Sequence, residues 1–265
     1  MHNEILDPKS QKRGDFKEAF NIGEFTEEGK ARQGMPEWME EREGELFEFE
    51  MLCRKTCDRI LDLLALGLEV EGEDREKFFS KRHTKPSGST TRLLYYPAVE
   101  GDYDEEAGDV RAGAHSDYGS CTLLFQKMGQ PGLEIRTEDD KGWAPVEVCP
   151  EGYERGRREG VPPILVNIGD LMSYWSNGML KSTVHRVIFP KGETRGRYSI
   201  VYFCHPGNEE KLVALPSKAV EGFRLEEGKE VGYGGGAAKE KAMTAREHLD
   251  NRLRATYDFR EEVKA

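Results

Sequence analysis

Hydrophobic residues recur along this chain with two different spacings, and the first is that of a helix. After Pro36 they return every three or four positions, as on the buried face of an α-helix. Acidic residues crowd the first turns of this stretch and Gly67 lies near its end, both typical of helix ends. The predicted long helix buries Leu46, Phe49, Cys53, Cys57, Leu61 and Leu64.

The second spacing begins at residue 91, where the apolar residues form short runs. Glycine, proline, aspartate and asparagine separate these runs, and many short strands divided by turn residues are typical of a β-sandwich, barrel or jelly roll. The stretch "GAHSDYGSCTLLFQ" (113–126) has the pattern of a strand that enters a turn. The predicted strands are 91–97, 121–126, 133–136, 143–148, 163–169, 182–189 and 197–204.

Three further segments are predicted nearer the ends of the chain. The segment "DFKEAF" (15–20) is a candidate short helix within a polar, irregular N-terminal region. The segment "MTAREHLDNRLRATY" (243–257) predicts a C-terminal helix, in which Thr244 and Glu247 fit a capping box. The segment "GYGGG" (232–236) follows no strand and opens no phosphate-binding helix, so it predicts a flexible linker.

Composition and charge narrow the class of protein. The chain has 265 residues, 37% of them hydrophobic, and a formal net charge of −11. This charge disfavours binding to nucleic acid or to anionic membranes, and no apolar run reaches the length of a membrane-spanning helix. The N-terminal residues lack the apolar region of a secretion signal, so we expect a cytoplasmic protein.

The cysteines are scattered and odd in number, which favours reduced thiols over a disulfide framework. Cys53 and Cys57 are four positions apart on one face of the predicted long helix. No second closely spaced pair accompanies them, so their spacing favours buried helix packing over a zinc site.

Three groups of polar residues lie within or beside the apolar strand segments. His115 and Asp117 are two positions apart, so on a strand they point to the same side and can share one metal ion. His185 lies in the segment 182–189, and Arg197 and Ser199 are two apart at the start of 197–204. Taken singly, each group has a plainer interpretation: a polar strand edge, a buried core histidine and an exposed strand arginine.

Together these groups match a known type of metal site. Two histidines and one carboxylate form the facial triad of non-haem Fe(II) oxygenases, which leaves open positions for a co-substrate and O₂. The planar guanidinium of Arg197 and the hydroxyl of Ser199 suit a carboxylate ligand. Ligand type alone also permits Zn²⁺ at the two histidines and the aspartate.

The segments "AHSDYGSCTLLFQ", "PILVNIGDLMSYWSNGMLKSTVHRV" and "RYSIVYFCHP" resemble the core of the 2-oxoglutarate- and Fe(II)-dependent dioxygenases. The branch is the one that contains isopenicillin N synthase and the plant gibberellin and flavonoid oxygenases. The resemblance runs from about residue 14 to the C-terminal helix and is dense between residues 90 and 206.

The resemblance implies a mainly β fold with flanking helices, namely a double-stranded β-helix (jelly roll) packed by the long helix. It implies that Fe(II) is held by His115, Asp117 and His185. The far carboxylate of 2-oxoglutarate is expected to pair with Arg197 and Ser199, and Tyr96 of the motif "LYYP" is expected to contact the co-substrate. In relatives an asparagine occupies the position of Leu94.

The implied reaction uses Fe(II), 2-oxoglutarate and O₂ to hydroxylate or desaturate a small organic molecule, with release of succinate and CO₂. Two alternatives stay open: an isopenicillin N synthase-like oxidase that uses no 2-oxoglutarate, and a catalytically silent binding protein. The second arises because relatives carry further N-terminal residues, which supply early strands and part of the substrate pocket. The segment 16–20 and the region of Phe203 are expected to line that pocket.

The expected organisation is one structural domain in a monomeric protein. Residues 1–89 form an irregular and helical segment that packs on the barrel, 90–210 form the Fe(II) and 2-oxoglutarate core, and 211–265 form a C-terminal extension with its helix. Within the core, Asp170, Asn177 and Gly178 are expected to be turn and cap residues that position the strand of His185.

Overall fold

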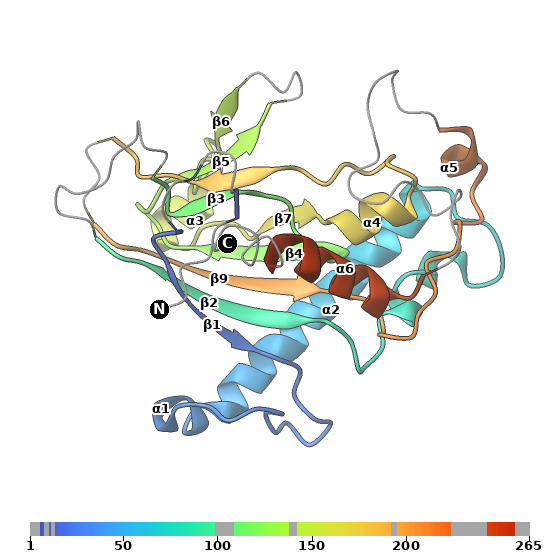
Figure 1. The fold of residues 1–265 in the computed structure, drawn as a ribbon, viewed down its shortest axis with the longest axis horizontal. Helices are drawn as coiled ribbons and strands as arrows, with labels where there is room; N and C mark the ends of the chain where they lie inside the picture. The colour runs from blue at the N-terminus through green and yellow to red at the C-terminus, as the bar shows by residue number, and fades with distance from the viewer. Residues whose placement is uncertain are drawn as a thin grey trace, which may run out of the picture.

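Two antiparallel sheets form the centre of the molecule in the computed structural model, which describes residues 6–7, 11, 14–98, 109–137, 142–191, 195–223 and 243–257 (Figure 1). One sheet has the strand order β1-β2-β9-β4-β7 and the other has the order β3-β8-β5-β6. Strands distant in sequence are neighbours in each sheet, as the predicted jelly roll requires. The strands are β1 (Glu18–Ile22), β2 (Thr90–Tyr96), β3 (Ala112–His115), β4 (Cys121–Gln126), β5 (Leu133–Arg136), β6 (Trp143–Pro145), β7 (Leu165–Ile168), β8 (His185–Val187) and β9 (Arg197–Cys204).

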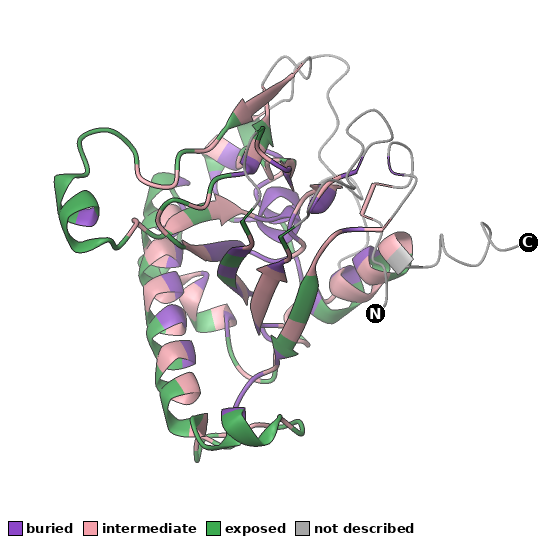
Figure 2. Cartoon of the chain, turned by 90° about the vertical axis from the view of Figure 1, so that its left-hand side faces the viewer, coloured by how far each residue is buried: buried purple, intermediate pink, exposed green. Residues whose placement is uncertain are grey.

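Helices flank the sheets, and the longest of them is the one that the sequence predicts. Its side chains Cys53, Cys57 and Leu61 are buried, and Phe49 and Leu64 pack against the same core. In Figure 2 the buried residues of this helix face the strands, while α6 lies on the opposite side of them. The helices are α1 (Glu37–Glu40), α2 (Glu43–Gly67), α3 (Glu154–Glu159), α4 (Asp170–Trp175), α5 (Lys218–Gly222) and α6 (Ala245–Tyr257), with single 3₁₀ turns at Arg75–Lys77 and Ser80–Arg82.

The predicted short helix at 15–20 is wrong, because these residues lead into a strand. Strand β1 begins at Glu18 and pairs antiparallel with β2, where Phe20 lies opposite Leu93. Pairing with β2 satisfies backbone groups on both strands, and this tertiary gain outweighs the local helical pattern. The predicted linker at 232–236 lies outside the described residues.

The C-terminal helix and its cap follow the sequence prediction. The backbone N–H of Thr244 donates to Glu247 Oε2 at 2.7 Å, and the backbone N–H of Glu247 donates to Thr244 Oγ1 at 3.1 Å. The two bonds form the predicted capping box at the start of α6. Asn177 and Gly178 also match their predicted turn role, since both adopt positive φ values, 53° and 81°.

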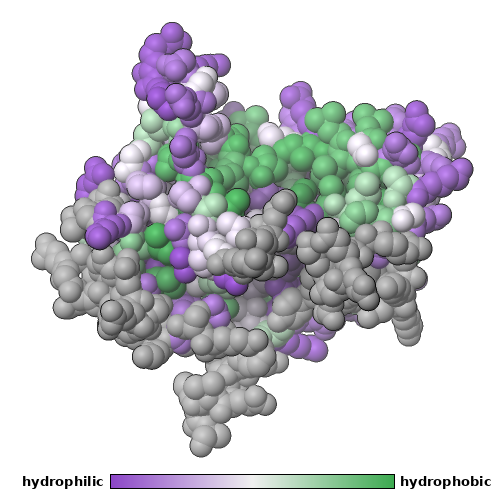
Figure 3. Space-filling model, turned by 90° about the horizontal axis from the view of Figure 1, so that it is seen from above, coloured by the Kyte–Doolittle hydropathy of each residue, from purple (hydrophilic) through white to green (hydrophobic). Residues whose placement is uncertain are grey.

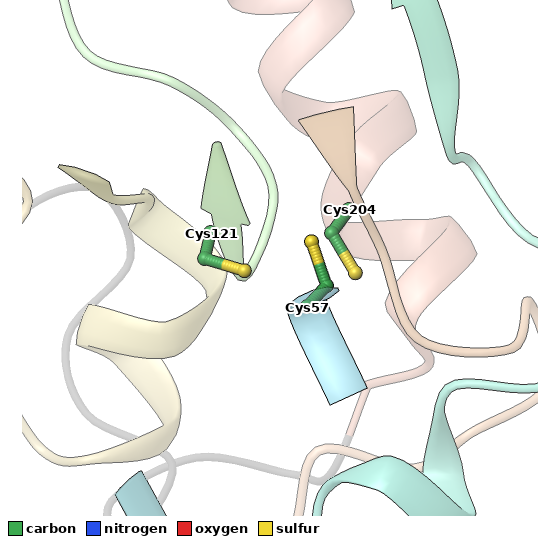
Figure 4. A group of neighbouring side chains, drawn as sticks. All are labelled: Cys57, Cys121 and Cys204. Atoms are coloured by element: carbon green, nitrogen blue, oxygen red, sulfur yellow. The ribbon is translucent and has the colours of Figure 1, made fainter. Parts of the chain in front are cut away.

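Three cysteines meet in the core between α2 and the five-stranded sheet. Cys57 of α2, Cys121 of β4 and Cys204 of β9 have their sulfur atoms within 4.8 Å of one another (Figure 4). Hydrogen bonding within the cluster raises the pKa of the Cys57 and Cys204 thiols well above the ordinary value and lowers that of Cys121 well below it. All three side chains are buried, and Cys57 packs in the hydrophobic core, as the sequence predicts.

A buried ion pair fixes α2 against the segment that follows β1. Lys85 Nζ lies 2.7 Å from Glu50 Oε1, and Glu50 Oε2 accepts the backbone N–H of Phe25 at 3.1 Å. The Glu50 side chain is 4% exposed. Its removal therefore leaves both the ammonium group and the N–H without this partner in a dry environment.

Replacing Glu50 by alanine is expected to lower the free energy of unfolding by about 3 kcal/mol, the typical effect of breaking a buried pair. Urea unfolding followed by circular dichroism measures this loss. Glu48→Ala is the matched control, because Glu48 is exposed on the same helix. Equal stability of the two variants would contradict a stabilising role for the Glu50 pair.

The surface mixes charged and apolar residues. Figure 3 shows an apolar region bordered by hydrophilic side chains on the face seen from above. Among the described residues, large apolar side chains that stay exposed include Val161, Ile164, Val166, Met179 and Val184. No helix in the described part of the chain has both the length and the apolar character needed to cross a membrane.

Candidate active site

The two histidines and the aspartate meet where the smaller sheet borders the loop after β3. His115 is the last residue of β3 and His185 is the first of β8, and the two lie opposite each other in the antiparallel pairing. Asp117 follows two residues after His115, in the loop rather than on the strand that its spacing suggests. The Nε2 atoms of His115 and His185 lie 4.0 and 3.7 Å from Asp117 Oδ1.

Backbone carbonyl groups orient both imidazole rings. Nδ1 of His115 lies 2.7 Å from the carbonyl oxygen of Gly113, and Nδ1 of His185 lies 3.0 Å from that of Thr183. A carbonyl oxygen only accepts, so each Nδ1 donates in these contacts and Nε2 is the ring nitrogen left for a further ligand. Both Nε2 atoms face Asp117, and metal-binding histidines are commonly fixed by such a bond from the other ring nitrogen.

Asp117 is held by two polar side chains that sequence analysis did not single out. Its Oδ2 atom accepts hydrogen bonds from Thr122 Oγ1 and Asn167 Nδ2, both at 2.7 Å. These bonds leave Oδ1 directed toward the histidines. Thr122 on β4 and Asn167 on β7 interrupt otherwise apolar strands, and this interruption is the signal that could have identified them.

Burial sets the protonation states of the site. Burial lowers the pKa of His115 to about 3, and the neighbouring His185 adds to the shift, so the ring is neutral at pH 7. Burial acts to raise the pKa of Asp117, but the two histidines and the bonds from Asn167 and Thr122 hold it below the ordinary value. A neutral imidazole at His115 and an ionised carboxylate at Asp117 are the protonation states that a divalent metal requires of such ligands.

The spacing of these atoms suits one metal ion. Ligand atoms that each lie about 2.1 Å from a metal are at most about 4.2 Å apart, and the separations of 3.7 and 4.0 Å satisfy this limit. The site has three protein ligand atoms, which leaves further coordination positions open.

A buried arginine lies in the same pocket. Arg197 is 1% exposed, and its guanidinium reaches Gln126 Oε1 at 3.1 Å and Ser199 Oγ at 3.4 Å. Among the described residues no carboxylate forms an ion pair with it, and its Nε–H has no hydrogen-bond partner. Burial lowers the pKa of Arg197, yet an arginine remains charged in proteins. A buried cation in this state fits a negatively charged ligand.

One cavity joins all six side chains that the sequence analysis selected. Tyr96 is buried at the end of β2, and the Arg197 guanidinium lies 5.1 Å from the centre of its ring. Leu94, at the position where relatives carry asparagine, lines the same cavity with an apolar side chain. The cavity is therefore lined by His115, Asp117, His185, Arg197, Ser199 and Tyr96 together.

A second cavity of about 270 Å³ is also lined by two of the candidate metal ligands. The residues that line both cavities are His115, Asp117, Arg92 and Phe203. The fold and this arrangement fit one class of protein: a jelly-roll enzyme in which two histidines and one carboxylate, as candidate metal ligands, lie beside a cavity with a buried arginine and a second cavity.

Comparison with known proteins gives the same class. Residues 87–206 match the family model of the 2OG-Fe(II) oxygenase superfamily. The chain is 34% identical over 259 residues to the UPF0676 protein C1494.01 of Schizosaccharomyces pombe, which covers 97% of this chain and 69% of that protein. It is 30% identical over 257 residues to the proline hydroxylase buaE of Petromyces alliaceus, covering 92% of this chain and 69% of the relative.

A solved structure agrees with this result. It is that of a full-length Neurospora crassa protein in complex with alpha-KG and thymine, which superposes with a TM-score of 0.68 at 29% identity. The match covers 92% of this chain and 66% of that protein. The chain thus spans about two thirds of the length of each of these three proteins.

The chain belongs to the 2OG-Fe(II) oxygenase superfamily. As the sequence predicts, it is a 2-oxoglutarate-dependent dioxygenase that oxidises a small molecule with Fe(II), 2-oxoglutarate and O₂.

Proposed function

We propose that His115, Asp117 and His185 hold the Fe(II) of this dioxygenase and that Arg197 binds its 2-oxoglutarate. The observation that carries the proposal is the single cavity lined by the three metal-ligand candidates and by a buried arginine without a carboxylate partner among the described residues. The overall reaction converts substrate, 2-oxoglutarate and O₂ into oxidised product, succinate and CO₂.

The proposed task of Arg197, Ser199 and Tyr96 is to hold the far carboxylate of 2-oxoglutarate. Arg197 offers N–H groups in a plane that matches a carboxylate, and Ser199 adds a hydroxyl donor beside it. The apolar side chains of Leu94 and Leu124 line the cavity between the two polar ends. This arrangement directs the keto-acid end of the co-substrate toward the metal ligands.

The remaining groups of the site orient the proposed metal ligands and shield the reacting centre from water. When bound, the iron supplies O₂ activation coupled to loss of CO₂ from 2-oxoglutarate. Gly113 and Thr183 fix the imidazole rings through their carbonyl groups, and Asn167 and Thr122 fix the carboxylate of Asp117. The buried walls keep bulk water from the reacting centre, which limits side reactions.

The second cavity is proposed to hold the substrate. Its walls combine apolar side chains of Leu249, Leu253 and Phe203 with the polar side chains of Asn21 and Arg92. The Arg92 Nε–H donates to Asn21 Oδ1 at 2.7 Å. The lining fits a small molecule with an apolar or planar body and an oxygen atom that accepts a hydrogen bond from the guanidinium.

The similar proteins supply the first compounds to test. The N. crassa neighbour binds thymine, and the P. alliaceus relative is named a proline hydroxylase. Thymine presents carbonyl oxygens on a planar ring, whereas proline presents a carboxylate. Stimulation of succinate release by either compound identifies the substrate class, and a lack of response to both excludes these two.

The proposed binding of co-substrate is tested without turnover. Under anaerobic conditions, addition of 2-oxoglutarate to the Fe(II)-loaded protein is expected to produce visible charge-transfer absorption, because its keto acid chelates the iron. An isopenicillin N synthase-like oxidase that uses no 2-oxoglutarate is expected to show no such absorption. Absence of the absorption in protein that binds Fe(II) therefore contradicts the 2-oxoglutarate assignment.

Replacing Asn167 by alanine is expected to weaken Fe(II) binding about 10-fold, because partners that orient a metal ligand typically contribute 10–100-fold to affinity. The side chain donates one of the two hydrogen bonds that fix Asp117. Anaerobic titration with Fe(II) measures the change. Asn208→Ala is the control, since Asn208 lies beyond β9 and lines neither cavity. Equal affinities of the two variants would contradict the role of Asn167.

The organisation of the whole protein also remains a proposal. We propose one domain, because helix α6 of the segment 211–265 contacts the loop of the core segment 90–210 through Tyr118 and Thr256, at 2.5 Å. We also propose a cytoplasmic monomer that does not bind nucleic acid, in keeping with the net charge of −11. Sedimentation equilibrium of the purified chain tests the oligomeric state.

A further inference from the structure

The C-terminal helix reaches the metal-binding loop through a buried ion pair. Arg252 Nη2 of α6 lies 2.7 Å from Asp170 Oδ2 at the start of α4. The two side chains are 7% and 3% exposed. The sequence predicts a turn or cap role for Asp170, which is the first residue of α4; its side chain also pairs with a helix about 80 residues further along the chain.

The pair contacts the residue between two metal-ligand candidates. Ser116 lies between His115 and Asp117, and its hydroxyl donates to Asp170 Oδ2 at 3.0 Å. Arg252 Nη2 in turn lies 3.4 Å from the Ser116 oxygen. The backbone N–H of Asp170 also donates to the carbonyl oxygen of Asp117 at 2.7 Å. Side chain and backbone of Asp170 thus hold the loop at two adjacent residues.

The next residue of the loop is bound to the same helix. The Arg252 guanidinium lies 4.6 Å from the centre of the Tyr118 ring, and the Tyr118 hydroxyl is 2.5 Å from Thr256 Oγ1. Arg252 and Thr256 are four positions apart, so they lie on one face of α6. From that face Leu249 and Leu253 line the proposed substrate cavity together with the metal ligands.

We propose that Arg252 and Asp170 are positioning residues, through which helix α6 sets the geometry of the metal-binding loop. The ion pair fixes Ser116, and Ser116 fixes the relative orientation of His115 and Asp117. The same helix forms a wall of the substrate cavity. Docking of the C-terminal helix and formation of the metal site are therefore coupled. The inference rests on the proposed assignment of the metal ligands.

Removing one charge of this pair is expected to change the geometry of the metal site as well as the stability of the folded protein. Truncation of Arg252 leaves the buried Asp170 carboxylate without this guanidinium, so that the Ser116 hydroxyl is bonded to a carboxylate that has lost its ion-pair partner. The loop then adopts a different average position, and the two ligands on either side of Ser116 lose their common orientation. A purely structural pair would alter the unfolding temperature and leave the affinity of the folded protein for Fe(II) unchanged.

The test is anaerobic titration of the full chain with Fe(II), in which calorimetry measures the dissociation constant. Arg252→Gln is expected to raise the dissociation constant for Fe(II) about 10-fold, and Arg252→Lys is expected to restore part of the loss by keeping the charge. The control is Arg246→Gln, which breaks an exposed pair with Asp250 on the same helix. At saturating Fe(II), the KM of Arg252→Gln for 2-oxoglutarate is expected to stay within about twofold of the value for the unmodified chain.

Ser116→Ala keeps the test valid if the arginine variant fails to fold. It deletes one hydroxyl, leaves the ion pair in place, and is expected to weaken Fe(II) binding at least threefold. Fe(II) affinities of Arg252→Gln and Ser116→Ala within twofold of Arg246→Gln would overturn the proposal. His185→Ala distinguishes failure of the metal-site assignment from failure of the coupling to α6. If His185→Ala binds Fe(II) normally, the metal-site assignment fails. If it loses Fe(II) binding while Arg252→Gln and Ser116→Ala do not, only the coupling fails.

Discussion

Replacement of Asp117 by alanine is expected to lower the affinity for Fe(II) by more than about 100-fold, beyond the effect of losing an orienting partner. Asp117 is the only carboxylate among the three grouped ligand candidates in the described chain, and its Oδ1 atom lies within 4.0 Å of both imidazole Nε2 atoms. Its loss leaves two imidazole nitrogen donors and removes the carboxylate of the set.

Anaerobic titration with Fe(II) measures this affinity, and circular dichroism checks that the variant is folded. Asp58→Ala serves as the control, because Asp58 is a partly buried carboxylate on α2, away from both cavities. Fe(II) binding that persists when His115 and Asp117 are both replaced by alanine would contradict the assignment of the ligands.

Replacement of Arg197 by alanine is expected to raise the KM for 2-oxoglutarate at least 30-fold while Fe(II) affinity changes little. Truncating one partner of a buried, hydrogen-bonded charge pair costs about 2–5 kcal/mol, and each 1.4 kcal/mol is tenfold in affinity. Ser199→Ala removes only the neighbouring hydroxyl, and its expected effect is about fivefold.

Succinate formation at varied 2-oxoglutarate, with Fe(II) held at saturation, measures the KM for 2-oxoglutarate separately from the affinity for Fe(II). Arg155→Ala is the control, since its pair with Glu159 is on the surface of α3. Equal losses of Fe(II) and 2-oxoglutarate affinity in Arg197→Ala would indicate that the arginine supports the fold rather than the co-substrate.

The strands and the long helix were predictable because each depends on local pattern. Short apolar runs and turn residues mark the segments that become β2, β4, β5 and β9, and the three-or-four spacing marks α2. The jelly-roll fold and the place of Tyr96 in the site followed from the family resemblance, whose motifs carry that information. Where the pattern was short and mixed, as at 15–20, pairing with β2 decided the structure.

Two of the unpredicted contacts join residues far apart in sequence. Asn167 reaches Asp117 across 50 positions, and Ser116 reaches Asp170 across 54. Each of these side chains has an ordinary local explanation, such as a strand polar residue or a helix cap. Only the folded chain brings the partners together, so the sequence marks Asn167 as a polar residue in an apolar strand but does not show which ligand it orients.

The central claim is that this chain couples a site made by His115, Asp117 and His185 to 2-oxoglutarate bound at Arg197. The most direct measurement is O₂-dependent succinate formation by the Fe(II)-loaded protein, compared with Asp117→Ala and Arg197→Ala. The account predicts succinate from the unmodified chain, none above background from Asp117→Ala, and recovery of Arg197→Ala only at high 2-oxoglutarate. Equal succinate formation by all three proteins would contradict it.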